Sequence, residues 1–270
     1  MHFRNLVPLA VALVPTVSAQ LADASAYLLG PLTCSCDKEA VNVCDVTKYG
    51  AVADGTTDLG PALYSAFAAC KSGGVVNIPT GTFAMSTFVT LSGGKAWAIN
   101  LEGTIIRTGN VSSGNMIVIT NSTDFEFYSS NGKGGMQGYG YQFHSRGSGV
   151  YGPRLLRLTN VTNFAVHDIA LVDSPAFHLV LATCSQGEVY NMIIRGGNEG
   201  GLDGIDVWGF DIWIHDVEVT NKDECVTVKN PSNHILVENI YCNWSGGCAM
   251  GSLGTNTSDD HRRQEALMEG

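Results

Sequence analysis

The sequence predicts an all-β protein whose chain winds as a right-handed parallel β-helix, and three observations support this prediction. First, short β-rich stretches separated by Gly, Ser, Asn and Thr follow one another from Val75 onward. Second, a motif of an apolar residue, any residue, Asp or Asn, and an apolar residue recurs at offsets of 23, 25 and 23 residues. Third, another apolar stretch follows each copy, so each repeat holds at least two strands. The copies are Val166–Ile169, Val189–Met192, Ile214–Val217 and Val237–Ile240.

A repeat of this length fits a solenoid better than a β-sandwich. A sandwich also has short strands, but they do not return with a fixed period in parallel sense. In a β-helix, equivalent residues of neighbouring turns lie about 4.8 Å apart and form ladders. We therefore expect the Asp or Asn of each motif, and the nearby histidines, to serve the architecture rather than the chemistry. These residues are Asp168, Asn191, Asp216 and Asn239, with His167, His178, His215 and His234.

Residues 1–19 have the layout of a secretory signal peptide. His2 and Arg4 precede an apolar run from Leu6 to Val14, and Val17-Ser18-Ala19 forms a small-residue cleavage site. The run is about half of the roughly 20 residues that a membrane span needs. We therefore expect a secreted, extracellular protein rather than a membrane-anchored one.

One helix is expected, between the leader and the first strands. Its apolar residues have helical spacing, and Gly73-Gly74 follows its end. A helix at this place would cap the first turn, which otherwise exposes its apolar face. Cys44 and Cys70 bracket the segment, and a disulfide between them would tie the helix to the solenoid. The apolar positions are Ala62, Leu63, Ala66, Phe67 and Ala69.

Composition is typical of a secreted glycoprotein. The net charge of −10 argues against nucleic acid or an anionic membrane as partner. Eight cysteines would tend to pair outside the cell, and Cys225 with Cys242 is a second expected disulfide. Cys34-Ser-Cys36 lacks the further Cys or His pair that zinc requires, and the pairing of Cys34, Cys36, Cys184 and Cys248 is open. Five sequons mark candidate glycosylation sites at Asn110, Asn121, Asn160, Asn243 and Asn256.

Four carboxylates form two glycine-flanked clusters one repeat apart. They are Asp203 and Asp206 in GGLDGIDVWG, and Asp223 and Glu224 in NKDECVTVK. Aligning Ile205 with Val226 by their strands puts Asp203 over Glu224, with Asp223 beside them. Repulsion in such a group raises at least one pKa and leaves the other acids ionised. A general acid and a general base are what glycosidic hydrolysis requires.

Solvated acids and a calcium site are the alternative interpretations of these clusters. The acids interrupt strand segments rather than loops, which argues against simple solvation. Calcium binds clustered carboxylates, but neither a DxDxDG loop nor a GGxGxDxUx nonapeptide is present. We therefore expect no metal ion and no cofactor.

Three motifs resemble the active-site signatures of glycoside hydrolase family 28, the pectin-degrading enzymes, and within it the fungal rhamnogalacturonan hydrolases. They are GLDGIDVW, KDEC at 222–225 and SGGCAMGSLG at 245–254, and the resemblance covers roughly residues 40–257. The polygalacturonase branch has Asn-Thr-Asp, Asp-Asp and Gly-His-Gly at these places. This chain has Gly201-Leu202-Asp203, Asp223-Glu224 and Gly246-Gly247-Cys248. These departures favour rhamnogalacturonan as the substrate.

The resemblance implies internal, inverting hydrolysis of the bond from galacturonic acid to rhamnose. Asp223 would protonate the leaving oxygen, Asp203 and Glu224 would activate the water, and Asp206 would support them. Inversion calls for an acid and a base about 6.5 to 9.5 Å apart, which neighbouring turns could supply. Lys229, at the end of the same strand as Glu224, would meet a substrate carboxylate, with a solvated lysine as the alternative.

The resemblance ends at residue 257. Family members continue with several more turns, whereas SDDHRRQEALMEG at 258–270 concentrates charge without a β pattern. We therefore expect a β-helix glycosidase domain over 20–257, incomplete at its C-terminus, and a non-family tail over 258–270. A polygalacturonase-type pectinase and a non-catalytic, polysaccharide-binding β-helix fragment are the alternatives. We expect a monomer whose partner is pectic polysaccharide.

Overall fold

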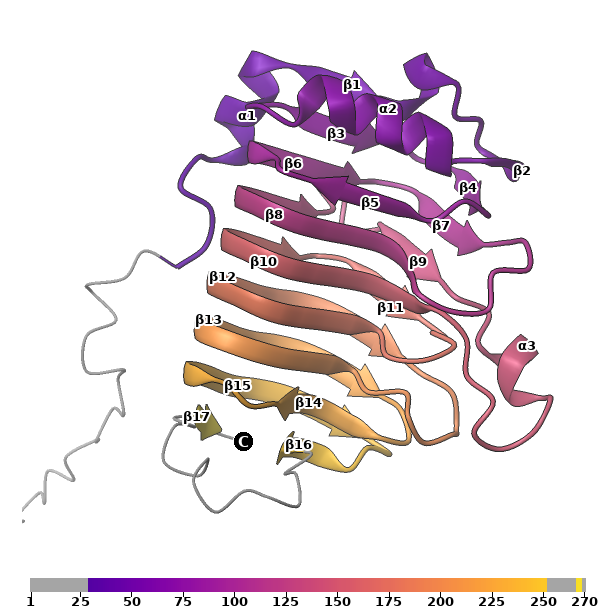
Figure 1. The fold of residues 1–270 in the computed structure, drawn as a ribbon, viewed down its shortest axis with the longest axis vertical. Coiled ribbons are helices and arrows are strands. Elements are labelled where there is room, and N and C mark those ends of the chain that lie inside the picture. Colours follow the sequence, from indigo (N-terminus) through magenta and orange to yellow (C-terminus); the bar gives the residue numbers. More distant parts are fainter. Residues whose placement is uncertain (1–28, 252–265, 269–270) are drawn as a thin grey trace, which may run out of the picture.

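A computed structural model describes residues 29–251 and 266–268, and this part of the chain forms a parallel β-helix (Figure 1). Every strand pairing in these residues is parallel. The expected solenoid is confirmed. The helices are α1 (Ser35–Val41), α2 (Gly60–Cys70) and α3 (Tyr141–His144), with a 3-10 helix, η1 (Val46–Tyr49). The strands are β1 (Val43–Asp45), β2 (Asp54–Asp58), β3 (Val75–Ile78), β4 (Thr82–Met85), β5 (Val89–Ser92), β6 (Lys95–Leu101), β7 (Thr104–Arg107), β8 (Asn115–Tyr128), β9 (Gly135–Gln137), β10 (Arg154–His167), β11 (Ala170–Val172), β12 (Leu179–Arg195), β13 (Ile205–Thr220), β14 (Glu224–Val228), β15 (Asn233–Asn243), β16 (Gly247–Met250) and β17 (Ala266–Met268).

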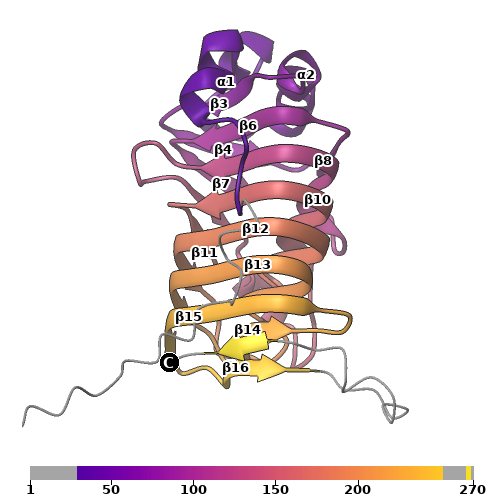
Figure 2. The same cartoon turned by 90° about the vertical axis from the view of Figure 1, so that its left-hand side faces the viewer.

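One face of the solenoid, called here the first sheet, positions the site. It consists of residues 117–119, 156–158, 179–181, 205–207, 226–228 and 248–250, taken from β8, β10, β12, β13, β14 and β16. Figure 2 shows β8, β10, β12 and β13 stacked one above another along the solenoid. Leu156 pairs with Leu179, Leu179 with Ile205, and Ile205 with Val226. These four side chains are buried in the interior. Because side chains alternate along a strand, the residue after each of them faces outward.

The Asp or Asn of each repeat motif turns the chain from one sheet into the next. All four have a positive φ, between 49° and 56°. This left-handed conformation is one that Asp and Asn tolerate better than most residues. Their expected architectural role is confirmed for Asp168, Asn191, Asp216 and Asn239.

Helix α2 covers the N-terminal end of the solenoid, as expected (Figure 1). The ring of Phe67 lies 4.8 Å from that of Trp97, which lies 4.6 Å from Phe125 in the next turn. This stack continues the apolar interior into the helix. Ala69, which helical spacing placed on the apolar face, is exposed, and Cys70 is buried instead.

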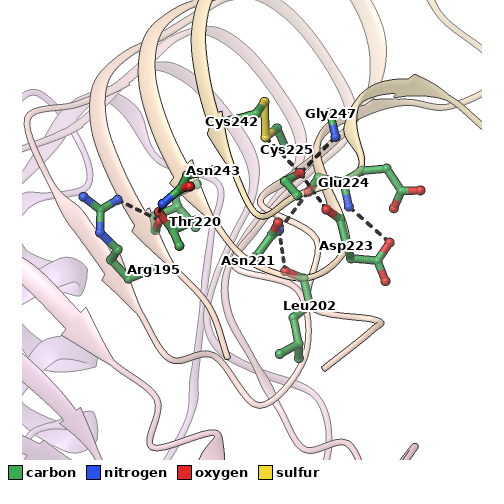
Figure 3. Close-up of a disulfide and its surroundings, with 12 residues drawn as sticks. Arg195, Leu202, Thr220, Asn221, Asp223, Glu224, Cys225, Cys242, Asn243 and Gly247 are labelled. Atoms are coloured by element: carbon green, nitrogen blue, oxygen red, sulfur yellow. Dashed lines mark hydrogen bonds between the residues drawn. A yellow bond between two sulfur atoms is a disulfide. The ribbon is translucent and has the colours of Figure 1, made fainter. Parts of the chain in front are cut away.

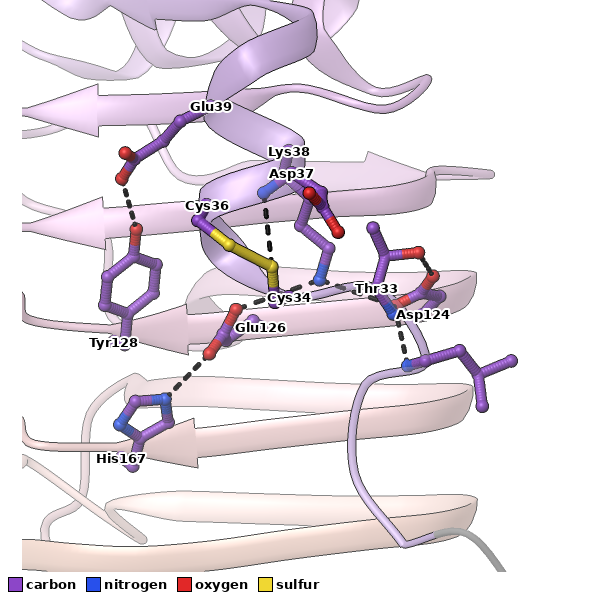
Figure 4. Close-up of polar contacts among 11 residues, drawn as sticks. Thr33, Cys34, Cys36, Asp37, Lys38, Glu39, Asp124, Glu126, Tyr128 and His167 are labelled. Atoms are coloured by element: carbon purple, nitrogen blue, oxygen red, sulfur yellow. Dashed lines mark hydrogen bonds and ion pairs between the residues drawn. A yellow bond between two sulfur atoms is a disulfide. The ribbon is translucent and has the colours of Figure 1, made fainter.

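Helices α1 and α3 were not expected from the sequence. Helix α3 is a single turn, and α1 has seven residues, too few to be stable alone. Figure 4 shows what anchors α1: Lys38 Nζ lies 3.4 Å from Asp124 Oδ1 and 3.8 Å from Glu126 Oε2. The Lys38 side chain is completely buried. A tertiary ion pair therefore supplies the stabilisation that local propensity does not.

Glu126 also contacts a ring stack on the same face (Figure 4). His167 Nε2 lies 3.0 Å from Glu126 Oε1, and its Nδ1 lies 2.6 Å from Asp168 Oδ2. The imidazole is sandwiched between Tyr128 and Tyr190, at centroid distances of 5.6 and 4.5 Å. Partial burial lowers the pKa of His167, but the hydrogen bonds with the two carboxylates outweigh it and raise the pKa. This histidine is structural, as expected.

Replacing His167 with glutamine is expected to cost more stability at pH 5 than at pH 8. Since the folded-state pKa is raised, the imidazolium stabilises the fold fully below its unfolded pKa of about 6.5, and the effect is lost as the pH rises through the folded value. We expect a difference of about 1 kcal/mol in the free energy of unfolding. Urea unfolding at both pH values measures it. His234→Gln, at a more exposed histidine, should cost less stability at pH 5 than His167→Gln does. An equal cost of His167→Gln at both pH values would contradict the structural role of this imidazolium.

Three disulfides lie in the described residues. Cys44–Cys70 and Cys225–Cys242 are the two pairs that the sequence favours, and the third joins Cys34 to Cys36. Cys184 is buried and Cys248 is half-buried, and both are free thiols. Of the four cysteines whose pairing was open, Cys34 and Cys36 therefore form a local disulfide, and Cys184 and Cys248 are unpaired.

The sequons differ in exposure. Asn110, Asn121 and Asn160 are exposed, whereas Asn243 is half-buried. Asn160 Nδ2 donates a hydrogen bond to Asn121 Oδ1 at 2.8 Å, because these residues occupy neighbouring turns. Asn256 lies outside the described residues, as does the expected signal peptide at 1–19.

The tail expected over 258–270 contains one described element. Strand β17 pairs in parallel with β15, so three residues for which no β pattern was expected add a strand to the sheet. No helix in residues 29–251 or 266–268 is long and apolar enough to span a membrane.

Candidate functional site

The four sequence-predicted acids converge on the first sheet. Asp203 and Asp223 lie in the loops that precede β13 and β14, not within strand segments as expected, whereas Asp206 is on β13 and Glu224 is the first residue of β14. Ile205 pairs with Val226, which confirms the alignment that puts Asp203 over Glu224. One oxygen each of Asp203, Asp223 and Glu224 lies within 4.8 Å of the other two. These three acids therefore form one cluster, called here the acid cluster, which is also close enough to hold a cation.

Backbone and amide groups hold the two acid-bearing loops together (Figure 3). The Gly201 N–H donates to Asp223 Oδ2, and the Glu224 N–H donates to Asp223 Oδ1 at 3.1 Å. Asn221 Nδ2 donates to the carbonyls of Leu202 and Glu224, both at 2.9 Å. Each loop is therefore fixed relative to its neighbour by bonds that cross between turns.

The flanking glycines are required by close packing. Gly201 has a φ of +71°, and a Cβ there would lie 2.6 Å from the ring of Tyr151. At Gly204 a Cβ would lie 2.4 Å from the carbonyl oxygen of Cys225. Only glycine allows neighbouring turns to approach this closely beside Asp203.

The turn after the acid cluster also supports it. Ser245 Oγ donates to the carbonyl of Asp223 at 2.6 Å, and the Gly246 N–H donates to the same oxygen at 2.9 Å. Gly247 pairs in register with Glu224. The Cys225–Cys242 disulfide lies immediately behind Glu224 (Figure 3). The Gly246-Gly247-Cys248 motif has no histidine. Together with the preceding Ser245, it therefore positions the acids through backbone groups and a hydroxyl.

His178 supports the cluster from the interior. It is fully buried, and its Nδ1 donates to the Asp203 carbonyl at 3.0 Å, while its Nε2 accepts from the Ser174 N–H at 3.3 Å. These two bonds select the neutral tautomer with the proton on Nδ1. Burial lowers the pKa of this imidazole and keeps it uncharged. His178 is a structural residue, as expected, and it fixes the backbone of a candidate catalytic acid.

Lys229 forms an ion pair with the buried Asp206 beside the cluster. Lys229 Nζ lies 2.9 Å from Asp206 Oδ1 and 3.9 Å from Asp203 Oδ2. Asp206 is 1% exposed, and Lys229 Nζ also lies 5.1 Å from the ring centroid of Phe177. Lys229 is therefore not the solvated lysine that was the alternative, and its charge already has a carboxylate partner.

The pKa values within the cluster are shifted in opposite directions. Burial, and then the charge of Asp206, raise the pKa of Asp203 to about 8. The hydrogen bond with Asp223, and then burial, raise the pKa of Glu224. Burial alone would raise the pKa of Asp223, but hydrogen bonds from Glu224 and the Gly201 amide lower it by more. Within the cluster, a proton is therefore favoured on Asp203 and a negative charge on Asp223.

The acids lie close to one another. The nearest oxygens of Asp203 and Asp223 lie within 4.8 Å, whereas the expected value of about 6.5 to 9.5 Å is the separation of two whole carboxyl groups. The two values concern different atoms, so the separation expected for inversion stays a prediction.

Four residues near the acid cluster were not predicted from the sequence as parts of the site. Tyr151 packs beside Gly201, and Phe177 precedes Leu179 by two residues, as Asp203 precedes Ile205. The pairing of β10 with β12 places Arg154 and Arg157 on β10, one turn before Phe177. Extending the repeat alignment back by two turns would have located the last three. Tyr151 belongs to a loop outside the repeat, so no periodic signal marks it.

Comparison with known proteins gives consistent matches. The family model for glycosyl hydrolases family 28 matches residues 70–263. Rhamnogalacturonase A of Aspergillus aculeatus is 63% identical over 255 residues, covering 94% of this chain and 56% of that protein. Rhamnogalacturonase A of Emericella nidulans is 66% identical over 229 residues, covering 85% and 45%. The chain thus spans about half the length of the curated relatives it matches.

Solved structures share the fold. The endo-xylogalacturonan hydrolase from Aspergillus tubingensis superposes with a TM-score of 0.72 at 25% identity, covering 79% of this chain and 61% of that one. Polygalacturonase from Erwinia carotovora gives a TM-score of 0.61 at 16% identity, covering 81% and 72%. The second likeness concerns the fold alone.

Proposed function

Because the chain belongs to glycosyl hydrolases family 28, we propose that it is a secreted, endo-acting glycosidase that hydrolyses the rhamnogalacturonan backbone of pectin. The single observation that carries this proposal is the acid cluster, in which Asp203, Asp223 and Glu224 face one another across neighbouring turns. Identity above 60% to two rhamnogalacturonases supports the substrate. The bond cut is the one from galacturonic acid to rhamnose.

The proposed reaction inverts the anomeric carbon in one step. Asp223 gives its proton to the glycosidic oxygen as the bond from that oxygen to the anomeric carbon breaks. Asp203 and Glu224 hold a water molecule, whose oxygen bonds to the anomeric carbon while its proton passes to one of the two carboxylates. Asp206, paired with Lys229 at 2.9 Å, supports the cluster from the side. General acid–base help of this kind contributes about 10²- to 10⁴-fold to a rate.

The productive protonation state requires a proton on Asp223. The pKa of Asp223 is lowered and that of Asp203 is raised, so this proton has to come from Asp203. Interacting acids titrate as a set, so a proton on the cluster can move to Asp223 without a further donor. Substrate binding favours that transfer, because it removes water from the half-exposed Asp223 and brings in the negative charge of galacturonate.

The proposed roles of Lys229 and of the exposed sequons follow from their surroundings. Lys229 is proposed to meet a substrate carboxylate at the edge of its pair with Asp206, since its side chain is 26% exposed. Exposed sequons at Asn110, Asn121 and Asn160 are proposed to carry glycans, which fits secretion. No metal ion has a part in the proposed step.

Parallel digestion of two polymers tests the proposal. The purified chain is incubated with rhamnogalacturonan and with polygalacturonan, and new reducing ends are counted over time. The proposal predicts new ends and rapid shortening of rhamnogalacturonan, with polygalacturonan left intact. Cleavage of polygalacturonan instead would identify a polygalacturonase-type pectinase. Binding of rhamnogalacturonan without new reducing ends would identify a non-catalytic fragment, and either result would overturn the proposal.

A further inference from the structure

Two arginines occupy, two turns earlier, the positions of two of the acids. Arg157 pairs with Val180, and Val180 pairs with Asp206, on the successive strands β10, β12 and β13. Arg157 and Asp206 therefore share one outward-facing column of the first sheet. At the spacing of parallel strands, two turns separate them by about 10 Å along the solenoid axis.

Arg154 has the same relationship to Asp203. Arg154, Phe177 and Asp203 each lie two residues before a buried residue of the first sheet, and these buried residues pair in succession. They form a second column, in which Phe177 lies between the arginine and the acid. The ring of Phe177 has the Arg154 guanidinium 4.8 Å and Lys229 Nζ 5.1 Å from its centroid. The arginines and the acid cluster are therefore parts of one continuous surface.

Neither guanidinium has a carboxylate partner within 4.0 Å among the residues that the structure describes. Arg154 Nε is buried without a hydrogen-bond acceptor in the described residues. Arg157 Nε donates to Thr159 Oγ1 at 3.1 Å, and its guanidinium lies 5.5 Å from the ring centroid of Trp208. Aromatic rings thus hold both groups in place and leave N–H donors free for a planar anion such as a carboxylate.

The charges around this pair favour an anionic ligand. Burial, and then the neighbouring charge of Arg154, lower the pKa of Arg157. Two partly buried cations that repel each other are stabilised when an anion binds between them. In a chain with a net charge of −10, an arginine pair without acidic partners is an unusual local excess of positive charge.

On the basis of the function proposed above, we infer that Arg154 and Arg157 bind a galacturonate carboxylate of the substrate. An extended disaccharide spans a distance similar to that between the arginines and the acid cluster. A polymer in which acidic and neutral sugars alternate would then place one carboxylate on the arginines each time the bond between galacturonic acid and rhamnose lies over the acids. The pair is therefore a specificity-determining subsite that sets the position of the polymer along the groove.

A binding experiment tests this inference without using catalysis. Rhamnogalacturonan oligosaccharides are titrated by calorimetry into the Asp223→Asn chain, alone and combined with Arg154→Gln or Arg157→Gln. Each glutamine variant is expected to raise Kd about 10-fold, the loss of roughly one hydrogen bond to a charged group. Arg157→Lys should recover only part of this loss, because lysine cannot form the bidentate contact. Arg195→Gln is the matched control, since that arginine pairs with Glu218 on a different sheet, and its Kd should not change.

Chemically reduced oligosaccharides, whose carboxylates have become alcohols, complete the cycle. They should bind the Asp223→Asn chain at least as weakly as native oligosaccharides bind the glutamine variants. Reduction should cost those variants less affinity than it costs the Asp223→Asn chain, because only the contacts with the remaining arginine and with Lys229 are left to lose. Equal binding of native and reduced oligosaccharides by the Asp223→Asn chain would overturn the inference, and this comparison needs no arginine variant to fold. No binding of the native oligosaccharides, or unchanged Kd in folded glutamine variants, would overturn it too. Failure of the function proposed above is distinct, because it appears as intact polymer in the parent digest.

Discussion

Replacing Asp223 with asparagine is expected to lower the rate of rhamnogalacturonan cleavage by about 10²- to 10⁴-fold, the contribution of a general acid. Asparagine keeps the size of the side chain and one of the oxygens that accept hydrogen bonds from Gly201 and Glu224, but it cannot give a proton to the leaving oxygen. Counting reducing ends at saturating polymer measures the change in kcat.

A surface acid provides the control for this prediction. Glu218 is 41% exposed and pairs with Arg195 on another sheet, so Glu218→Gln should cut the polymer at the parent rate. Urea unfolding of both variants shows whether the fold is intact. An Asp223→Asn chain that folds and cuts as fast as the parent would remove Asp223 from the mechanism.

Replacing Lys229 with methionine is expected to destabilise the fold by about 3 kcal/mol, since removing one partner of a buried pair leaves an uncompensated charge. Asp206 is 1% exposed, and Lys229 Nζ, 2.9 Å away, is its ion-pair partner in the described residues. The double variant Asp206→Leu with Lys229→Met should regain most of the loss, because no buried charge is left. The free energy of unfolding from urea titrations at pH 7 gives both values.

Lys222→Met is the matched control for the ion pair. Lys222 lies seven residues earlier on an exposed position next to the same loop, and its replacement should change the stability by less than about 0.5 kcal/mol. If Lys229→Met unfolds at the same urea concentration as Lys222→Met, the pair with Asp206 contributes nothing to the fold.

The register of the acid-bearing turns could be predicted because a solenoid repeats its side-chain pattern once per turn. Aligning Ile205 with Val226 was enough to place Asp203 over Glu224, and the pairing of these strands is as expected. The capping helix α2 was predictable for a similar reason, since its buried face is continuous in the sequence.

The parts that the sequence did not reveal depend on contacts between distant residues. Lys38 looks like a surface lysine in a polar leader, and only its contacts with Asp124 and Glu126 explain why α1 forms and why the side chain is buried. Lys229 similarly resembles a solvated residue until its pairing with Asp206 is known. The charge partners of a lysine have no periodic signal.

The order of the pKa values in the acid cluster also could not be predicted. Register places the acids in neighbouring turns, but the pKa of each acid depends on its burial and its hydrogen bonds. Burial and the charge of Asp206 raise the pKa of Asp203, whereas, against the effect of burial, hydrogen bonds from Glu224 and the Gly201 amide lower that of Asp223. The sequence indicated which acids meet, and their surroundings determine which of them favours a proton.

The most direct test of the account is the stereochemistry of the first products. Rhamnogalacturonan is digested by the purified chain in an NMR tube, and the anomeric proton of each newly formed galacturonate end is followed before it equilibrates in water. We expect these ends to appear first as the anomer opposite to the one in the polymer, because water held by Asp203 and Glu224 attacks in a single step. Ends that first appear with the configuration of the polymer, or no new ends at all, would contradict it.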